Sequence, residues 1–500
     1  MIVMKFGGTS VGGAEQIAQV AEIVKRFRQG RLQPSSPAAN EPATRHSKQA
    51  TIVVSAMSGV TDLLISAARS AGRRDGEAFR QAAGELRRRH RAVVETLVES
   101  AGRRAPLLWE IDALVGDFEN LCQAIFVLGE LTARGLDAVA SFGERLAARL
   151  VAAALRERGV PAQAVEATNL IVTDDNYGAA SPLMEATRGR TRAVLLPLLD
   201  EGTTPVVTGY IGATAEGTTT TLGRGGSDYS AAILGSCLDS PEIWIWTDVD
   251  GVLTADPRVV PEARTLPEIS YGEAAELSYF GARVLHPKTI LPAVERGIPL
   301  RILNTFKPDH PGTRVVAEEQ PNTCAVKGIT SIKGLSLVTV EGRGMIGVPG
   351  IAARLFAAVA GEGISVLMIS QSSSEQNICF VIRQETTAQA LAALESAFEL
   401  ERARRNVDRI WAQEDVAIIA VVGAGLKETP GVGARVFGAL GTRGINVISI
   451  AQGSSKYNLS LVVGEEDADD AVRAIHQDLR LGEIRGNEAT REWGNEATRE

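Results

Sequence analysis

Two glycine-rich segments carry side chains that suit an anionic ligand. The first, KFGGTS at residues 5–10, ends a short apolar run and precedes a segment with helical periodicity, Ala14–Arg28. Glycines let the backbone approach a phosphate, while Lys5 and the amides of a helix N-terminus supply positive potential. An ordinary strand–turn–helix connection with a surface lysine would give the same pattern. The spacing differs from GxxxxGK[ST], which excludes a Walker A loop.

The second segment is LGRGGSD at residues 222–228, which follows a run of four threonines. Arg224 can pair with a carboxylate through two parallel hydrogen bonds. Gly225 and Gly226 expose backbone amides, and Ser227 or Asp228 can cap the helix that follows. A capped glycine loop without a ligand is the alternative, but an arginine beside a glycine pair favours a binding role.

Acidic residues occupy two further candidate positions. In WTDVDGVLTADPR (246–258) three aspartates surround a glycine turn, and Arg258 could contact phosphate. Carboxylates there would repel a triphosphate unless they order a metal or bond a sugar or base; a polar hairpin is the alternative. In SFGE (141–144), Glu144 could accept from an ammonium group, although an acid in the first turn of a helix also suits the helix dipole.

The elements that must position these groups alternate between strand and helix. Strands are predicted at 1–6, 51–55, 205–208 and 242–247, and helices at 14–28, 227–237 and 271–285; residues 63–158 are mostly helical. This order is typical of an α/β fold with a mostly parallel sheet covered by helices. Ligands of such sheets bind at the carboxyl ends of the strands, where the glycine turns would meet.

The C-terminal part contains an internal repeat. Residues 349–382 align without a gap on residues 430–463, and each copy has the βαββαβ order of a ferredoxin-like domain. The predicted domains are a catalytic domain at 1–307 with a solvated insert at 29–49, a linker at 308–332, and repeats at 333–412 and 413–485. Residues 486–500 contain the heptad GNEATRE twice and are treated as a tail.

Composition excludes several classes of protein. The 500 residues suggest about three domains, and 52 basic against 60 acidic residues give a net charge of −8 with no basic domain, so nucleic-acid binding is not expected. The four cysteines lie far apart, which fits neither a disulfide framework nor a zinc site. No apolar run reaches the roughly 18 residues of a membrane span, and no signal peptide is apparent; we therefore expect a cytoplasmic protein.

Together these segments resemble the aspartate kinases of the amino-acid kinase family. The resemblance rests on KFGGTSV (5–11), VVSAMSGVTDLL (53–64), SFGE (141–144), TTTLGRGGSDYSAA (219–232), WTDVDGVLTADPR (246–258) and ELSYFGARVLHPKT (276–289). The repeats are similar to paired ACT domains that bind amino-acid effectors. Their QSSSE and QGSS segments are closest to the threonine-sensitive type, including the kinase half of bifunctional aspartate kinase–homoserine dehydrogenases. With no second Rossmann segment following, the resemblance implies kinase activity alone.

The resemblance implies that Mg-ATP and L-aspartate are converted to 4-phospho-L-aspartate and ADP, at the start of lysine, threonine, methionine and isoleucine biosynthesis. It implies two catalytic residues, Lys5 and Asp228. The implied ATP-binding residues are Lys5, Gly7, Gly8, Thr247, Asp248, Leu253, Arg258 and Arg283. The implied aspartate-binding residues are Ser10, Thr61, Glu144, Arg224, Gly225, Gly226 and Ser227. The effector residues would be Gln371, Asn377, Gln452 and Asn458, with threonine favoured over lysine. No protein-bound metal site and no contact with nucleic acid or membrane is expected, but a homodimer or larger oligomer is.

The chain departs from the family pattern at two positions. Leu253 stands where tyrosine is common, and Arg283 stands where lysine is frequent, so nucleotide affinity is the property in question. Two other readings stay open. The chain could be a kinase of another amino acid, or an amino-acid sensor without catalysis. The retained Lys5, Arg224 and Asp228 argue against the sensor.

Overall fold

The computed structural model describes residues 1–32, 48–281, 285–317, 325–371, 376–426, 428–452 and 457–483. Most of the predicted insert at 29–49, Arg283 and the tail at 486–500 therefore lie outside the described residues. The chain forms two compact units. The first contains residues 1–252, 267–271 and 284–318, and the second contains residues 253–266, 272–283 and 319–500.

The first unit is built on an eight-stranded sheet in the order β3-β4-β2-β1-β7-β9-β10-β8. All neighbouring strands are parallel except β9 and β10. This confirms the predicted α/β class with a mostly parallel sheet. The strands are β1 (Ile2–Phe6), β2 (Ala50–Val54), β3 (Ala162–Val165), β4 (Thr204–Thr208), β7 (Ile243–Thr247), β8 (Glu268–Ser270), β9 (Leu300–Asn304) and β10 (Thr313–Val316).

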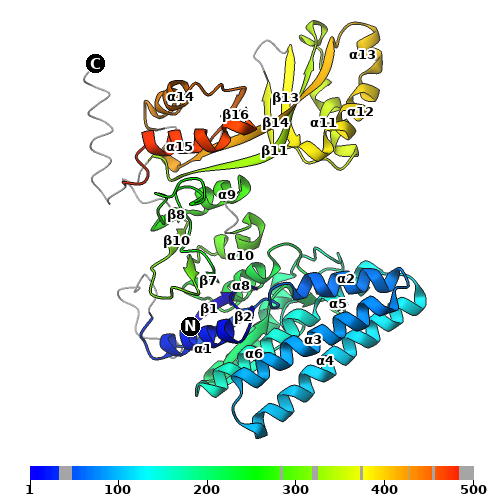
Figure 1. Ribbon diagram of the computed structural model, residues 1–500, viewed down its shortest axis with the longest axis vertical. Coiled ribbons are helices and arrows are strands. Elements are labelled where there is room, and N and C mark those ends of the chain that lie inside the picture. Colours follow the sequence, from blue (N-terminus) through cyan, green and yellow to red (C-terminus); the bar gives the residue numbers. More distant parts are fainter. Residues whose placement is uncertain are drawn as a thin grey trace. The chain divides into compact units, whose positions relative to one another are not determined.

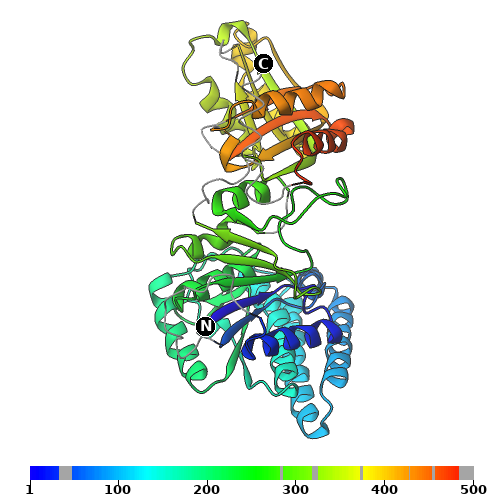
Figure 2. The ribbon, with the colours of Figure 1, turned by 90° about the vertical axis from the view of Figure 1, so that its left-hand side faces the viewer.

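Helices cover this sheet, and the long helices α3 and α4 lie side by side (Figures 1 and 2). The described part of the chain contains no helix that is long and apolar enough to cross a membrane. The helices of the first unit are α1 (Ala14–Arg28), α2 (Val60–Gly72), α3 (Gly76–Leu97), α4 (Ala101–Leu128), α5 (Ala133–Ala140), α6 (Phe142–Glu157), α7 (Met184–Asp200), α8 (Gly226–Cys237) and α10 (Leu291–Val294).

The alternation of side chains in β1 places apolar residues on one face of the sheet and Lys5 on the other. Ile2, Met4 and Phe6 are buried in the core that includes residues of α1 and α6. Successive side chains of a strand point to opposite faces, so Lys5 lies on the other face. There it meets Asp228 in the first turn of α8. A buried strand next to a glycine turn therefore places one cation at the end of the sheet.

The second unit contains both repeats in one six-stranded antiparallel sheet, ordered β12-β13-β11-β14-β16-β15. The 14-residue strands β11 (Gly328–Glu341) and β14 (Arg409–Val422) occupy equivalent positions, 81 residues apart, and pair along their length. Each supplies the first strand of one repeat and the closing strand of the other. The remaining elements are α11 (Ile351–Gly361), β12 (Met368–Gln371), β13 (Asn377–Arg383), α12 (Thr387–Ala397), α13 (Glu399–Ala403), α14 (Val432–Thr442), β15 (Ser449–Ala451), β16 (Asn458–Gly464) and α15 (Ala468–Asp478).

One helix is shorter than predicted. α9 covers Tyr271–Tyr279 and does not reach Leu285. Gly281 explains the early end, because its φ is +114° and a Cβ there would lie 3.0 Å from the carbonyl oxygen of Ser331. Only glycine adopts that backbone conformation readily, so the helix stops before it. The predicted His286-Pro287 stop begins a short 3₁₀ helix at Pro287–Ile290 instead.

Candidate active site

Four loops of the first unit leave the sheet at the same edge. They follow β1, β2, β4 and β7, whose ladders are mutually parallel and place the ends Phe6, Val54, Thr208 and Thr247 together. Two of these loops are hydrogen-bonded to the end of a neighbouring strand. The Gly7 amide donates to the Trp246 carbonyl at 3.3 Å, and the Gly209 amide donates to the Val54 carbonyl at 2.8 Å. The glycine turns expected to meet at one edge therefore do so.

Lys5 and Asp228 form the central ion pair of this edge, with Nζ and Oδ1 2.7 Å apart. Their side chains are 12% and 15% exposed, so the pair is largely shielded and still reachable by a ligand. Gly7 and Gly8 follow directly. A Cβ at Gly7 would lie 3.4 Å from Lys5 Nζ, and one at Gly8 would lie 3.2 Å from the Ala56 carbonyl oxygen. A side chain at Gly7 would thus contact the ammonium group, and one at Gly8 would press on the loop that follows β2.

Glu144 lies in the first turn of α6 and is 3% exposed. Its Oε1 accepts from the Ala56 amide at 3.1 Å, but Oε2 is buried and finds no hydrogen-bond partner among the described residues. Burial raises the pKa of this carboxyl to about 8. A buried acid with a free oxygen is poised to receive a cationic or hydrogen-bond-donating group.

The Arg224 loop is shaped by glycine. Gly225 has φ +69°, and a Cβ there would lie 2.9 Å from Cγ2 of Thr289. Gly226 begins α8, where a Cβ would lie 2.6 Å from the Tyr210 ring, and Ser227 is buried beside Gly209. The Arg224 side chain itself is exposed. Close packing at the glycines therefore holds the loop backbone in place, while the Arg224 guanidinium stays accessible to a ligand.

The predicted nucleotide loop is divided between the units. Thr247 ends β7 in the first unit, and its hydroxyl donates to the carboxylate of the next residue, Asp248, at 3.1 Å. Asp250 is held there by Asn304 and by Lys307, whose Nζ lies 2.7 Å away, and the Lys307 hydrogen bond lowers the Asp250 pKa.

Leu253 and Arg258 belong to the second unit. The Arg258 guanidinium is paired with Asp256 at 2.6 Å, and its side chain is otherwise 89% exposed. Arg283, the remaining residue predicted to bind nucleotide, lies outside the described residues. Within the first unit, the structure thus brings Thr247 and Asp248 to the sheet edge beside the Gly7 loop.

Two predicted substrate hydroxyls differ in their surroundings. Ser10 is fully buried, with its Oγ 2.7 Å from Thr305 Oγ1, so the structure does not bring this hydroxyl to the open edge. Thr61 is half-buried in the first turn of α2. It follows the loop that leaves β2 and stays available to a ligand.

Two residues at this edge were not predicted. Asp137 of α5 is 2% exposed and accepts three hydrogen bonds from the segments beside the Arg224 loop. Tyr210 has φ +68°, a strained backbone conformation for a side chain of this size, and lies two residues after the end of β4. In the sequence, an acidic residue within the apolar helical stretch Leu136–Phe142 could have pointed to Asp137. No sequence feature pointed to Tyr210.

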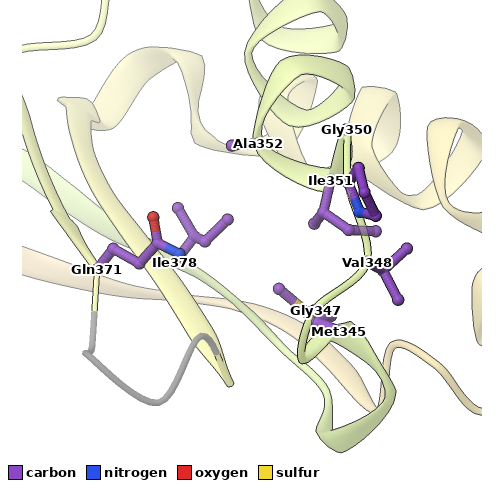
Figure 3. Close-up of a pocket in the computed structure, with 9 residues that line it drawn as sticks. Met345, Gly347, Val348, Gly350, Ile351, Ala352, Gln371 and Ile378 are labelled. Atoms are coloured by element: carbon purple, nitrogen blue, oxygen red, sulfur yellow. The ribbon is translucent and has the colours of Figure 1, made fainter.

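The second unit contains a cavity of about 310 Å³ in the first repeat (Figure 3). Gln371 and Ile378 line it from the strands, opposite a loop that leads into α11. The full lining is Met345, Gly347, Val348, Pro349, Gly350, Ile351, Ala352, Gln371 and Ile378. Its volume falls at the lower end of the roughly 300–1,000 Å³ found for ligand pockets. One of the four predicted effector residues therefore lines a cavity.

The equivalent residues of the second repeat have different surroundings. Gln452 is exposed after β15, while Asn458 donates to Glu276 of α9 at 3.1 Å. Glu273 of the same helix accepts from the Ala424 amide at 3.0 Å. Asn377, the counterpart of Asn458, begins β13 and pairs with Glu341 of β11 in the sheet. The two repeats are thus alike in fold but differ in which polar groups are already engaged.

Comparison with known proteins gives the family. Residues 1–304 match the amino acid kinase family, and residues 338–398 and 419–479 match the ACT domain. Lysine-sensitive aspartokinase 3 of Escherichia coli K12 is 33% identical over 487 residues, covering 96% of this chain and 99% of that protein. The chain belongs to the aspartokinases of the amino acid kinase family. The resemblance first seen in the motifs is confirmed.

Bifunctional and monofunctional aspartokinases are both similar to this chain. The bifunctional aspartokinase/homoserine dehydrogenase 1 of Zea mays is 36% identical over 486 residues, covering 95% of the chain and 50% of the relative. The chain thus spans about half the length of such relatives. E. coli aspartokinase III in complex with lysine and aspartate is a structural neighbour with a TM-score of 0.76 and 33% identity, covering 96% and 99% of the two chains.

The same E. coli enzyme in complex with aspartate and ADP matches with a TM-score of 0.74 and 32% identity, covering 96% of this chain and all of that one. The two aspartokinase structures therefore agree with the fold over both units. The predicted fold class, an amino-acid kinase fold followed by two ferredoxin-like ACT domains, is confirmed.

Proposed function

We propose that this aspartokinase transfers the γ-phosphoryl group of ATP to the side-chain carboxylate of L-aspartate, giving 4-phospho-L-aspartate and ADP. One observation carries the proposal: the shielded Lys5–Asp228 pair lies at the carboxyl end of β1 beside the Gly7-Gly8 turn, while buried Glu144 keeps one oxygen unpaired. The E. coli relative in complex with aspartate and ADP supports the choice of substrates. The product would enter lysine, threonine, methionine and isoleucine biosynthesis.

The chemistry places modest demands on the protein. A carboxylate is already a nucleophile at neutral pH, so alignment and neutralisation of phosphoryl charge account for most of catalysis. We assign Lys5 to the transferring phosphoryl oxygens, with the amides of Gly7 and Gly8 beside it. Asp228 orients the Lys5 ammonium through their ion pair.

Arg224 would pair with the substrate α-carboxylate and Glu144 with its ammonium group. Gly225, Gly226, Ser227 and the hydroxyl of Thr61 would complete this pocket. Because Ser10 is bonded to Thr305, we assign it to support of the Gly7–Gly8 turn. Thr247 and Asp248 would contact the nucleotide, and Leu253, Arg258 and Arg283 remain proposed nucleotide contacts.

Magnesium is the second proposed cofactor. Within the described residues, no group of three or more His, Cys, Asp and Glu side chains could hold a metal ion. We assign Mg²⁺ to the substrate phosphates and to one or two carboxylates, here those of Asp228 or Asp248. When bound, the ion would neutralise phosphate charge.

We further propose amino-acid feedback through the ACT repeats, with threonine favoured over lysine. The cavity lined by Gln371 supports a site in the first repeat, and the E. coli relative in complex with lysine supports an amino acid as its ligand. A homodimer or larger oligomer, a cytoplasmic location and the domain limits 1–307, 308–332, 333–412 and 413–485 are part of the same proposal. The family matches at 1–304, 338–398 and 419–479 support these limits.

The test uses hydroxylamine, which converts an acyl phosphate to a hydroxamate. Purified protein is incubated with Mg-ATP, L-aspartate and hydroxylamine, and aspartyl hydroxamate is measured. We expect Lys5→Ala to lower the rate by at least about a thousandfold, because it removes the charge that faces the phosphoryl group. The exposed Lys48→Ala serves as the control and should keep the wild-type rate.

Circular dichroism and thermal melting establish that Lys5→Ala is folded. A folded Lys5→Ala protein with the wild-type rate would refute the assigned role of Lys5. A wild-type protein without aspartyl hydroxamate would refute the substrate; testing other amino acids then separates a different kinase from a sensor.

A further inference from the structure

Asp137 of α5 has the most completely satisfied buried carboxylate near the candidate site. Its Oδ1 accepts from the Thr221 hydroxyl at 2.7 Å, and its Oδ2 accepts from the amides of Thr221 and Gly178 at 2.8 and 2.9 Å. The side chain is 2% exposed. Burying a carboxylate is costly unless donors surround it, so this arrangement requires the three donors to stay in place.

The donors belong to the segments that carry Arg224. Thr221 ends β6 (Thr219–Thr221), which pairs with β5 (Ile211–Ala213), and Arg224 follows three residues later. Gly223 has φ +78°, and a Cβ there would lie 3.2 Å from the carbonyl oxygen of Gly178. The Arg224 loop therefore lies against the Gly178 turn, and Asp137 holds both.

The backbone of Asp137 continues toward Glu144. The Ser141 amide donates to the Asp137 carbonyl at 3.1 Å, so α5 passes directly into the junction where α6 begins. Glu144 lies in the first turn of α6. Asp137 therefore connects two parts of the site. Its side chain holds the Arg224 loop, and its helix leads into α6, which carries Glu144.

We propose that Asp137 is a positioning residue that fixes the separation of Arg224 and Glu144, and so determines the length of amino acid that the site accepts. The proposal deepens the proposed function and rests on it. Arg224 and Glu144 bind the two charged groups of an α-amino acid; their separation controls how far its side-chain carboxylate extends toward Lys5. Asp137 contacts none of these groups and acts through the segments it joins.

Asp137→Asn tests this with little change in volume. An amide has one acceptor oxygen where the carboxylate has two, and its NH₂ group would face an N–H or O–H donor. We expect the KM for aspartate to rise by about tenfold or more. The KM for ATP should stay within about twofold and kcat within about threefold, because Lys5 and Asp228 belong to other elements. Exposed Asp117→Asn on α4 is the matched control.

Discrimination against the longer amino acid is the second measurement. The preference for L-aspartate over L-glutamate, as a ratio of kcat/KM values, should fall about tenfold in Asp137→Asn and stay constant in Asp117→Asn. Thr221→Val removes only the hydroxyl donor, so it should change the same parameters less. Combined with Asp137→Asn, it should add little. If Asp137→Asn does not fold, Thr221→Val carries the test.

An unchanged KM for aspartate in the folded variants would overturn the proposal. So would equal losses for aspartate, ATP and kcat, which would mean a general structural role. Failure of the proposed function looks different, because the wild-type protein would then make no aspartyl hydroxamate. The same comparison is then made with whichever amino acid the wild-type protein phosphorylates, since the argument needs only an α-amino acid between Arg224 and Glu144.

Discussion

Glu144 carries a charge that depends on what is bound beside it. In the free protein its buried Oε2 has no partner within the described residues, and burial raises the carboxyl pKa to about 8. The folded protein therefore holds a proton on Glu144 at neutral pH, whereas the unfolded chain does not. A substrate ammonium group would favour the charged carboxylate and expel that proton.

This proton gives a stability prediction with a definite sign. Between the ordinary carboxyl pKa of 4.5 and the folded value of about 8, the folded state binds more protons than the unfolded state. The free energy of unfolding therefore falls as the pH rises through this window. From pH 5 to pH 8, the free energy of unfolding of the wild-type protein in urea should fall by on the order of a few kcal/mol relative to that of Glu144→Gln, whose side chain cannot ionise. A difference independent of pH would contradict the protonated state.

Individual candidate residues could be identified from the sequence where they lie within recognisable motifs. Lys5, Arg224 and Glu144 each lie within two residues of a glycine, in segments whose composition alone makes them candidates. Asp137 was missed because its partners Thr221 and Gly178 come from segments far along the chain. Hydrogen bonds between distant segments leave no local pattern. Ser10 shows the reverse case, since a hydroxyl in a promising motif is bonded to Thr305 instead.

The junction between the loop after β2 and helix α6 requires a glycine, Gly143. A Cβ at Gly143 would lie 2.6 Å from the Ala56 Cβ and 3.4 Å from atoms of Leu64 and Val60. The adjacent Ala56 amide donates to Glu144, so this close approach also holds the site's buried acid. The helix and the loop after the strand meet at van der Waals contact, with no room for a methyl group.

Gly143→Ala should therefore separate these elements. We expect a loss of about 1–3 kcal/mol in the free energy of unfolding from overpacking, together with reduced kinase activity as Glu144 moves. Gly84→Ala in α3 is the control, because nothing lies within 4 Å of its Cβ position. There alanine should be neutral or stabilising by up to about 1 kcal/mol. Equal effects of the two substitutions in chemical denaturation would contradict the packing argument.

Helices and strands with strong periodicity were predictable from sequence. Ala14–Arg28 was predicted with the bounds observed for α1, and the predicted strands at 205–208 and 242–247 match β4 and β7 within one residue. α9 was predicted too long because apolar periodicity continues past Gly281, whose backbone conformation only the structure reveals. Three-residue strands such as β5, β6 and β8 were missed, since they are too short to display alternation.

The two repeats share one fold but differ in which residues they present. Strands β11 and β14 pair along their length and make the two repeats a single sheet. Yet Asn458 of the second repeat is committed to Glu276 of α9, while the first repeat presents the cavity lined by Gln371. Equivalent positions in the alignment therefore need not be equivalent in function.

Effector inhibition should distinguish the two repeats. We expect Gln371→Ala to raise the concentration of threonine or lysine that halves hydroxamate formation by about tenfold or more, because it removes a polar group from the cavity wall. Gln452→Ala, the matched change in the second repeat, should alter it by less than about twofold. Both proteins should keep the uninhibited rate. Equal shifts in both variants would place effector recognition in the second repeat as well.

The division of the chain between the two units has a consequence for exchanging regulatory halves between enzymes. Residues 253–266 and 272–283 precede the proposed linker but belong to the same unit as the repeats. Ala255 and Val260 are buried in the same core as Leu479 and Leu481, and Thr254 bonds to His476. A graft joined in the proposed linker would take the repeats without these two stretches and would expose the apolar side chains of Leu479 and Leu481. We therefore expect an exchange of regulatory halves between enzymes to succeed only when residues 253–266 and 272–283 move together with the repeats.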